Sequence, residues 1–298
     1  MIRALALAFA AAVLAAPGLA AEEIKLSVVA TSSDLKSLVE AVGGERVEVE
    51  SLADPRQDPH AVEVKPKQLA RLRRAALLVR IGLDHEPWLA RMAPGGDTLV
   101  VDASGGARLL QTETPRLRLE RKAHVHAYGN THYWLDPGNA QPITAAILQA
   151  LVKLRPAERA LFETNRSAFL LRLGEKMREW DAALKPYRGA KIVVIHDSWT
   201  YFADRFGLQI VAAAEPSPGV PPSPAELAAL FRRMREGQVR VVVADPHANP
   251  ALVRQIADRG GARAVVLAPS VGADPAAKDY FSLFDVNVVR LAEVLKGG

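Results

Sequence analysis

The sequence predicts an α/β fold in two lobes, each a four-stranded, mainly parallel sheet with flanking helices, joined by one long rigid helix. At 298 residues, the chain is long enough for two domains. In each half, short β-branched runs alternate with helical patterns, which is typical of parallel sheets with crossover helices. Between the halves lies one long stretch with the 3.6-residue period of a helix.

Residues 1–21 are interpreted as a cleaved secretory signal peptide. Arg3 supplies a positive charge, residues 4–16 are apolar, and the small residues Ala20 and Ala21 suit cleavage. The apolar run is shorter than the ~20 residues that a membrane-spanning helix needs. We therefore expect the mature protein to be exported and periplasmic.

The N-terminal lobe is expected over residues 22–150. Its candidate strands are residues 24–30, 47–52, 76–81 and 99–102. Helices are predicted over residues 33–42 and 67–75. The first of these begins with serine and is followed by Gly43 and Gly44, which are typical start and stop signals of a helix.

The linking long helix is predicted over residues 151–187. Large apolar residues recur there at helical spacing, at Phe162, Phe169, Leu173, Met177, Trp180 and Leu184. Pro156 suits an N-terminal helix position, and Pro186 ends the run. The pattern covers about 28 residues, or roughly 42 Å of helix. A helix of this length can connect two lobes rigidly.

The C-terminal lobe is expected over residues 188–298. Its candidate strands are residues 191–196, 209–214, 240–244 and 264–267. Its candidate helices are residues 224–236, 250–259 and 279–296. The alternation of strands and helices again predicts a parallel sheet.

Composition excludes several classes of function. Lysine and arginine exceed aspartate and glutamate by 38 to 33, a formal net charge of +5, but the basic residues are scattered along the chain. A diffuse excess does not favour nucleic-acid binding. The chain has no cysteine, which excludes disulfides, thiolate metal sites and cysteine nucleophiles. A metal site would therefore use histidine and carboxylate ligands.

Three of the seven histidines follow predicted strands: His60, His132 and His196. Taken singly, each could be an ordinary surface or hydrogen-bonded residue. Ligands of open α/β sheets bind beyond the carboxyl ends of parallel strands, so these imidazoles can converge in one crevice. Neutral imidazole suits zinc, with a carboxylate or water completing a tetrahedron, whereas manganese prefers more oxygen ligands. The three histidines thus favour Zn²⁺, with manganese as the less favoured ion.

Four segments carry recognisable motifs in order along the chain. They are Asp58-Pro59-His60 with the residues to Pro66, His132 to Pro137, His196 to Leu208, and Asp279-Tyr280-Phe281 with Asn287. Together they resemble the zinc/manganese solute-binding proteins of bacterial ABC transporters, the cluster A-I family, which includes metal-binding adhesins.

The resemblance implies two lobes bridged by a long helix, with the metal held between them. It implies that His60 and His132 of the first lobe and His196 of the second are ligands. Histidine at the third position is typical of zinc proteins in this family, and glutamate there is typical of manganese proteins. The implied partners are an ABC permease and its ATPase, with a periplasmic zinc chaperone as a further candidate. We expect a monomer.

The chain departs from the family pattern at one position. A fourth, carboxylate ligand usually comes from the loop after the last strand, but that position falls on Ala268, which cannot coordinate a metal. Asp274 in the same loop is the candidate replacement, and water is the alternative. Because three neutral imidazoles leave the charge of the ion uncompensated, a nearby carboxylate would strengthen binding.

The other histidines are not expected to be ligands. His124 and His126 form a short pair before His132, which is either a weak capture site or an incidental polar loop. His85 and His247 also follow predicted strands. The family motifs have no ligand at these two positions, so we interpret both as outer-shell or surface residues.

Two alternative functions stay open. Three histidines with an open position also describe a catalytic zinc, so a secreted zinc-dependent hydrolase is one alternative. We do not expect an enzyme, because the sequence contains neither His-Glu-x-x-His nor Gly-x-Ser-x-Gly. The other alternative is an adhesin whose fold is stabilised by the metal.

Overall fold

The computed structural model describes residues 24–57, 62, 65–110, 129–216 and 219–297. The expected signal peptide lies outside these described residues. Within them, no helix is both long enough and apolar enough to cross a membrane.

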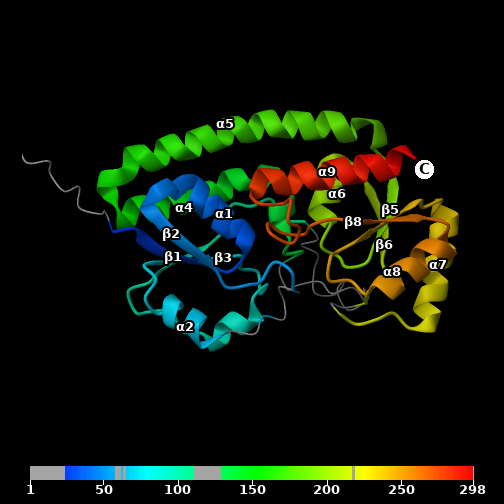
Figure 1. Cartoon of the computed structure of the whole chain (residues 1–298), viewed down its shortest axis with the longest axis horizontal. Coiled ribbons are helices and arrows are strands. Elements are labelled where there is room, and N and C mark those ends of the chain that lie inside the picture. The colour runs from blue at the N-terminus through cyan, green and yellow to red at the C-terminus, as the bar shows by residue number, and fades with distance from the viewer. Residues whose placement is uncertain (1–23, 58–61, 63–64, 111–128, 217–218, 298) are drawn as a thin grey trace, which may run out of the picture.

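The N-terminal lobe contains a parallel four-stranded sheet in the order β2-β1-β3-β4 (Figure 1). Its strands are β1 (Leu26–Ala30), β2 (Val47–Ser51), β3 (Leu77–Arg80) and β4 (Leu99–Asp102). All four predicted strands are confirmed to within two residues at each end. In the central strand, Val28 pairs with Val49 of β2 and Leu77 of β3, and all three side chains are buried. The β-branched and aliphatic runs therefore form a sheet that is covered on both faces, as parallel sheets usually are.

Helices cover both faces of this sheet. They are α1 (Ser33–Gly43), α2 (Pro66–Leu72) and α4 (Ala140–Leu154). Helices α1 and α4 lie between the sheet and the long helix α5 (Arg159–Leu184), and α2 covers the opposite face (Figure 1). The side chain of Ser32 accepts a hydrogen bond from the Leu35 amide, which fixes the start of α1. Helix α4 was not predicted.

The C-terminal lobe repeats the same strand order, as β6-β5-β7-β8, again with all strands parallel. Its strands are β5 (Lys191–Val194), β6 (Gln209–Ala213), β7 (Val241–Ala244) and β8 (Arg263–Val266). Each lies within two residues of its predicted bounds. The helices are α6 (Thr200–Phe206), α7 (Pro224–Gly237), α8 (Pro250–Gly260) and α9 (Tyr280–Lys296). Of these, only α6 was not predicted.

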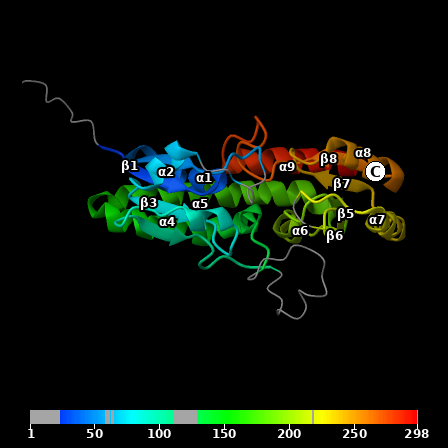
Figure 2. The ribbon, with the colours of Figure 1, turned by 90° about the horizontal axis from the view of Figure 1, so that it is seen from below.

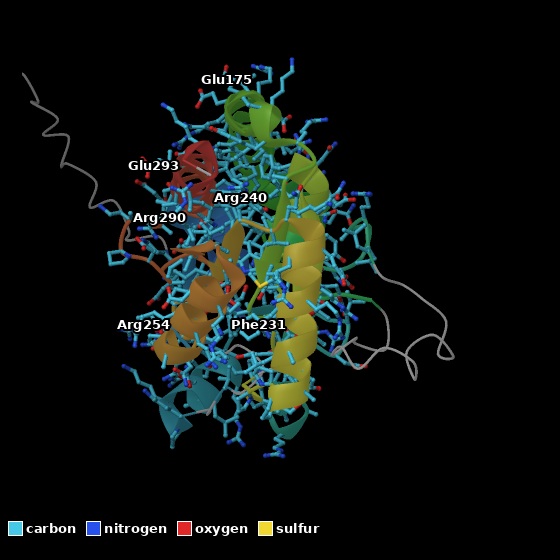
Figure 3. All side chains as sticks on the ribbon, turned by 90° about the vertical axis from the view of Figure 1, so that its right-hand side faces the viewer. Glu175, Phe231, Arg240, Arg254, Arg290 and Glu293 are labelled. Atoms are coloured by element: carbon cyan, nitrogen blue, oxygen red, sulfur yellow. The ribbon has the colours of Figure 1, made fainter. Side chains whose placement is uncertain are left out.

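The two faces of the second sheet carry different helices. Helices α6 and α9 lie on the side of α5, and α7 and α8 cover the other side (Figure 1). Phe231 of α7 is buried in a cluster that includes Val253 and Ile256 of α8, whereas Arg254 points outward (Figure 3). Apolar residues recur three or four positions apart in both helices, as at Leu227, Leu230 and Met234 of α7, which explains why both helices could be predicted.

Helix α5 runs along both lobes (Figure 2). It has 26 residues and packs against α1, α4 and α9. Five members of its predicted apolar stripe are buried: Phe162, Phe169, Leu173, Trp180 and Leu184. The Trp180 ring lies 4.9 Å from the Phe284 ring, and its Nε1–H donates to Asp285 at 2.8 Å. The predicted linking helix is confirmed, although residues 151–154 end α4 and α5 itself begins at Arg159.

Short 3₁₀ turns connect several of these elements. They are η1 (Gly44–Arg46), η2 (Pro87–Arg91), η3 (Tyr133–Leu135), η4 (Pro137–Asn139), η5 (Pro156–Glu158) and η6 (Lys185–Tyr187).

The loop between β8 and α9, residues 267–279, is hydrogen-bonded to the N-terminal lobe. The Trp134 indole N–H donates to the Pro269 carbonyl at 2.9 Å, and the Val271 amide donates to Asp34 at 2.9 Å. The Tyr280 hydroxyl donates to the Trp134 carbonyl at 2.7 Å. These bonds fix the position of one lobe relative to the other.

Asp34 is fully buried at this contact between the lobes. Burial disfavours the charged carboxylate and raises the pKa of Asp34 to about 7, although the hydrogen bond from Val271 acts in the opposite direction. Near neutral pH, this interlobe contact therefore contains a carboxyl group that readily changes its charge.

Candidate metal centre

Four histidines line one cleft between the lobes. His85 and His132 come from the N-terminal lobe, and His196 and His247 come from the C-terminal lobe. The cleft holds about 490 Å³ of space, part of it open to solvent. Each lobe thus contributes imidazoles at the carboxyl edge of its sheet, as expected for an open α/β fold.

The His132 ring is fixed by its neighbour Asn130. The His132 Nδ1 atom lies 3.0 Å from the Asn130 Oδ1 atom, and the His132 amide N–H donates to the same oxygen. An amide oxygen only accepts hydrogen bonds, so this bond requires the proton on Nδ1 and leaves the lone pair on Nε2. His132 is 4% exposed and lines the cleft. A histidine held in this way has the tautomer that a metal ligand needs.

The His196 ring has an equivalent partner in Glu215. The His196 Nδ1 atom lies 3.6 Å from a Glu215 carboxylate oxygen, and both side chains are 13% exposed. A carboxylate favours a proton on Nδ1, which leaves Nε2 of His196 for a ligand. Sequence reasoning missed both Asn130 and Glu215, because neither has a motif of its own.

The two rings are separated by a distance that suits a shared ion. The ring centres of His132 and His196 lie 5.7 Å apart. With Zn–N bonds of about 2.1 Å and a tetrahedral angle, two imidazoles on one ion have ring centres roughly 5 Å apart. His132 and His196 thus line the same cleft at this separation, and their role as metal ligands stays a prediction.

A second carboxylate, Asp245, interacts electrostatically with His196. Asp245 is 2% exposed, and one of its oxygens accepts the Trp199 indole N–H at 2.9 Å. The positive charge of His196 and His247 would lower the pKa of Asp245, but burial dominates and raises it.

His85 is held deep in the cleft wall by an unusual loop. It is 1% exposed, and its ring centre lies 5.5 Å from that of His132. The three residues before it, Gly82, Leu83 and Asp84, have φ angles of 79°, 55° and 58°. This left-handed backbone is costly for residues other than glycine. The Glu86 carboxylate anchors the loop by accepting the Gly82 amide at 3.0 Å.

Asp274 does not line the cleft. Its carboxylate pairs with Arg290 at 2.7 Å and accepts the Ala276 amide at 2.9 Å. Both interactions lower the pKa of Asp274. Figure 3 shows Arg290 on the outside of the C-terminal lobe. Ala268 is fully buried and is held by Asn287, whose side-chain amide bonds to both its N–H and its carbonyl at 2.8 Å.

The remaining predicted site residues lie outside the described part of the chain. This holds for His60 and for the pair His124 and His126. Among the described residues alone, no three His, Asp or Glu side chains are arranged to hold a metal ion.

Comparison with known proteins identifies relatives of the whole fold. A model of the family described as zinc-uptake complex component A periplasmic (ZnuA) matches residues 28–294. The crystal structure of a ZnuA protein superposes with a TM-score of 0.79 at 27% identity, covering 91% of this chain and 99% of that one. A manganese-bound periplasmic metal-binding protein from Candidatus Liberibacter asiaticus shares the fold with a TM-score of 0.77 at 17% identity, covering 91% of this chain and 100% of that one.

Curated relatives are similar over different lengths. The high-affinity zinc uptake system protein ZnuA of Brucella abortus (strain 2308) is 32% identical over 165 residues, 55% of this chain and 48% of that protein. The zinc-binding lipoprotein AdcA of Streptococcus pneumoniae (strain R6) is 25% identical over 282 residues, 90% of this chain and 56% of that protein. The chain spans about half the length of these curated relatives. Because the family model matches nearly the whole chain, this protein belongs to the ZnuA family of periplasmic zinc-uptake components.

Proposed function

We propose that this protein captures Zn²⁺ in the cleft between its lobes and delivers it to an ABC permease for import. The observation that carries the proposal is the pairing of His132 and His196. These imidazoles come from opposite lobes, their ring centres lie 5.7 Å apart, and each has Nδ1 facing an oxygen acceptor. Neutral imidazoles with fixed tautomers are well-suited zinc ligands.

The proposed ligand shell consists of His60, His132 and His196. The first of these comes from the sequence motif and the family, and the other two are supported by the geometry of the cleft. Asp274 could join the shell only by leaving Arg290, which it contacts at 2.7 Å. A water molecule could equally complete the tetrahedron.

Zinc is proposed over manganese because of the donor atoms. The cleft is lined by four imidazoles, and its one carboxylate side chain among the described lining residues, Asp54, is paired with Arg56 at 2.9 Å. Manganese prefers several oxygen ligands, whereas zinc accepts a shell rich in nitrogen. The Glu215 carboxylate would offset the charge of the ion from the Nδ1 side of the His196 ring.

The location and partners follow from the family and the N-terminal sequence. We propose that residues 1–21 direct export and that the mature protein works as a periplasmic monomer. Its partners would be a permease and its ATPase, and a zinc chaperone could load it. Solute-binding proteins of this family serve transport, so we do not propose an enzymatic activity.

Isothermal titration of the metal-free mature protein with Zn²⁺ tests the proposal. We expect one ion per chain, at least tenfold weaker binding for His132→Ala and His196→Ala, and unchanged binding for the control His124→Ala. Circular dichroism should show that the metal-free protein stays folded. Unfolding without zinc would instead indicate a structural metal, and turnover of ester or peptide substrates that depends on His196 would indicate a hydrolase.

A further inference from the structure

One of the hydrogen bonds between the lobes ends on a carboxyl group. The Val271 amide of the β8–α9 loop donates to Oδ1 of Asp34 in α1 at 2.9 Å. Pro269 and Ser270, which precede Val271, line the cleft, and so does Ser33, which precedes Asp34. The bond from Val271 to Asp34 therefore connects two walls of the cleft, one from each lobe.

The Asp34 carboxyl group is poorly placed to carry a charge. It is fully buried, and no hydrogen bond of ordinary geometry reaches its second oxygen, Oδ2, from any of the described residues. A buried carboxylate oxygen without a partner is costly. Burial raises the pKa of Asp34 to about 7, although the Val271 amide, the Ser270 hydroxyl and the amide of Asp34 itself act in the opposite direction. When Oδ2 holds a proton, it can donate to the Ser270 hydroxyl oxygen.

The charged side chains of α1 and of the β8–α9 loop are exposed or have partners of their own. They are Lys36 with Glu40 at 3.7 Å, Asp274 with Arg290 at 2.7 Å, Asp279 with the Ser282 amide at 2.7 Å, and the exposed Lys278. In α9, the Tyr280 phenol interacts electrostatically with Asp34, and its pKa is raised by burial and by the charges of Asp136 and Asp34. This phenol therefore stays neutral through the range in which Asp34 titrates.

The other titratable groups on this side of α1 are the four histidines of the cleft, which share its lining with Ser33 and Ser270. They titrate in the wild type and in an Asp34 variant alike. A comparison of the two proteins therefore separates the effect of Asp34 from the effect of the imidazoles.

We propose that Asp34 is a pH-dependent latch between the lobes: its neutral carboxyl group holds the β8–α9 loop against α1, and loss of its proton releases the loop. Release exposes Asp34 to water, where its pKa returns towards the ordinary value of 3.8. The docked loop thus binds the proton more strongly than the released loop does. The stabilisation of the docked loop is complete below about pH 3.8 and is lost as the pH rises to about 7. The inference goes beyond the proposed function, because it concerns the protein without zinc.

Hydrogen–deuterium exchange of the metal-free mature protein at pH 5 and pH 7 tests the latch. After correction for the intrinsic pH dependence of exchange, protection of the Val271 amide should fall by roughly 50-fold from pH 5 to pH 7, since linkage costs nearly tenfold per pH unit in this range. The amides of the buried strand β7, Val241–Ala244, should be better protected at both pH values. Equal protection of Val271 and β7 would show that the loop opens only when the whole protein unfolds, and would overturn the inference.

The test variant is Asp34→Asn, which keeps an oxygen for the Val271 amide and cannot ionise. Its Val271 amide should remain protected, with less than about a threefold change from pH 5 to pH 7. The matched control is Asp97→Asn, which removes an exposed carboxylate from the same lobe and should keep the pH dependence of the wild type. The same pH dependence in Asp34→Asn as in the wild type would assign the effect to other groups.

A second measurement needs no stable variant. In the metal-free wild type, the ¹³C signal of the Asp34 carboxyl group should titrate with a midpoint near pH 7. A midpoint near pH 4, or protection of the Val271 amide that does not change with pH, would overturn the latch. Because the protein is free of metal throughout, each of these outcomes leaves the proposed function standing.

Discussion

Replacement of Glu215 by glutamine should weaken zinc binding without removing a ligand. The substitution keeps the size of the side chain and removes one negative charge, 3.6 Å from the Nδ1 atom of His196. Across the imidazole ring, that charge lies roughly 7 Å from an ion on Nε2. At this distance, the attraction between a double positive and a single negative charge is about 1 kcal/mol in water and about 5 kcal/mol at an effective dielectric constant of 20.

The true effect should lie between these limits, because Glu215 is largely but not completely buried. Outer-shell partners of metal-bound histidine typically contribute about 10- to 100-fold in affinity, which is about 1.4 to 2.7 kcal/mol. We therefore expect Glu215→Gln to raise the zinc dissociation constant by about 10- to 100-fold.

A chelator-competition titration at fixed pH and ionic strength measures this effect. The matched control is Glu236→Gln, which removes the same charge from the exposed surface of α7 in the same lobe. Its effect should be less than about twofold, since exposed charges are screened by salt. Equal zinc affinity for Glu215→Gln and the wild type would refute the assignment of Nε2 of His196 as the metal-binding atom.

Three further predictions concern stability and the cleft wall. Asp34 has a pKa raised to about 7, so the folded state binds the Asp34 proton more strongly than the unfolded state does. The contribution of the protonated carboxyl group to the free energy of unfolding is complete below about pH 3.8 and is lost as the pH rises to about 7. Asp34→Asn should accordingly flatten the dependence of melting temperature on pH between 5 and 8, and an unchanged slope would contradict the interpretation. Trp180→Ala should lower the free energy of unfolding by about 3–5 kcal/mol in a urea titration, and Trp180→Phe by less, because the ring is 2% exposed against Phe284. Gly82→Ala should lower the melting temperature, since φ is +79° and the added methyl would overlap the Asp102 carboxylate; wild-type stability would show that the loop relaxes freely.

Strands were the most predictable part of the fold. In parallel sheets, both faces are covered, so the central strands are short continuous apolar runs such as Val241–Ala244, whose residues are all buried. Helix α5 was predictable because its apolar stripe persists over many turns. Helix α6 was not, because Thr200–Phe206 spans only about two turns and offers too few residues to define a period. Helix α4 was not predicted, and only its last four residues, 151–154, fall within the predicted linking helix.

The candidate site was predictable only in part. The strand-end rule, which depends on topology alone, predicted that His132 and His196 lie in one crevice, and both line the same cleft. The partners of these rings depend on tertiary packing: Asn130 contacts His132 through a tight local turn, and Glu215 reaches His196 from the neighbouring strand β6. The position of His247 in the cleft follows from the order of the strands, which the sequence pattern does not specify.

The central claim is that a single zinc ion is held between the lobes by histidines from both of them. Anomalous diffraction at the zinc edge, from crystals of the zinc-loaded mature protein, tests it most directly. The account predicts one strong anomalous peak within about 2.1 Å of Nε2 of both His132 and His196. A principal peak elsewhere, for example beside His124 and His126, or a peak that contacts only one lobe, would contradict it.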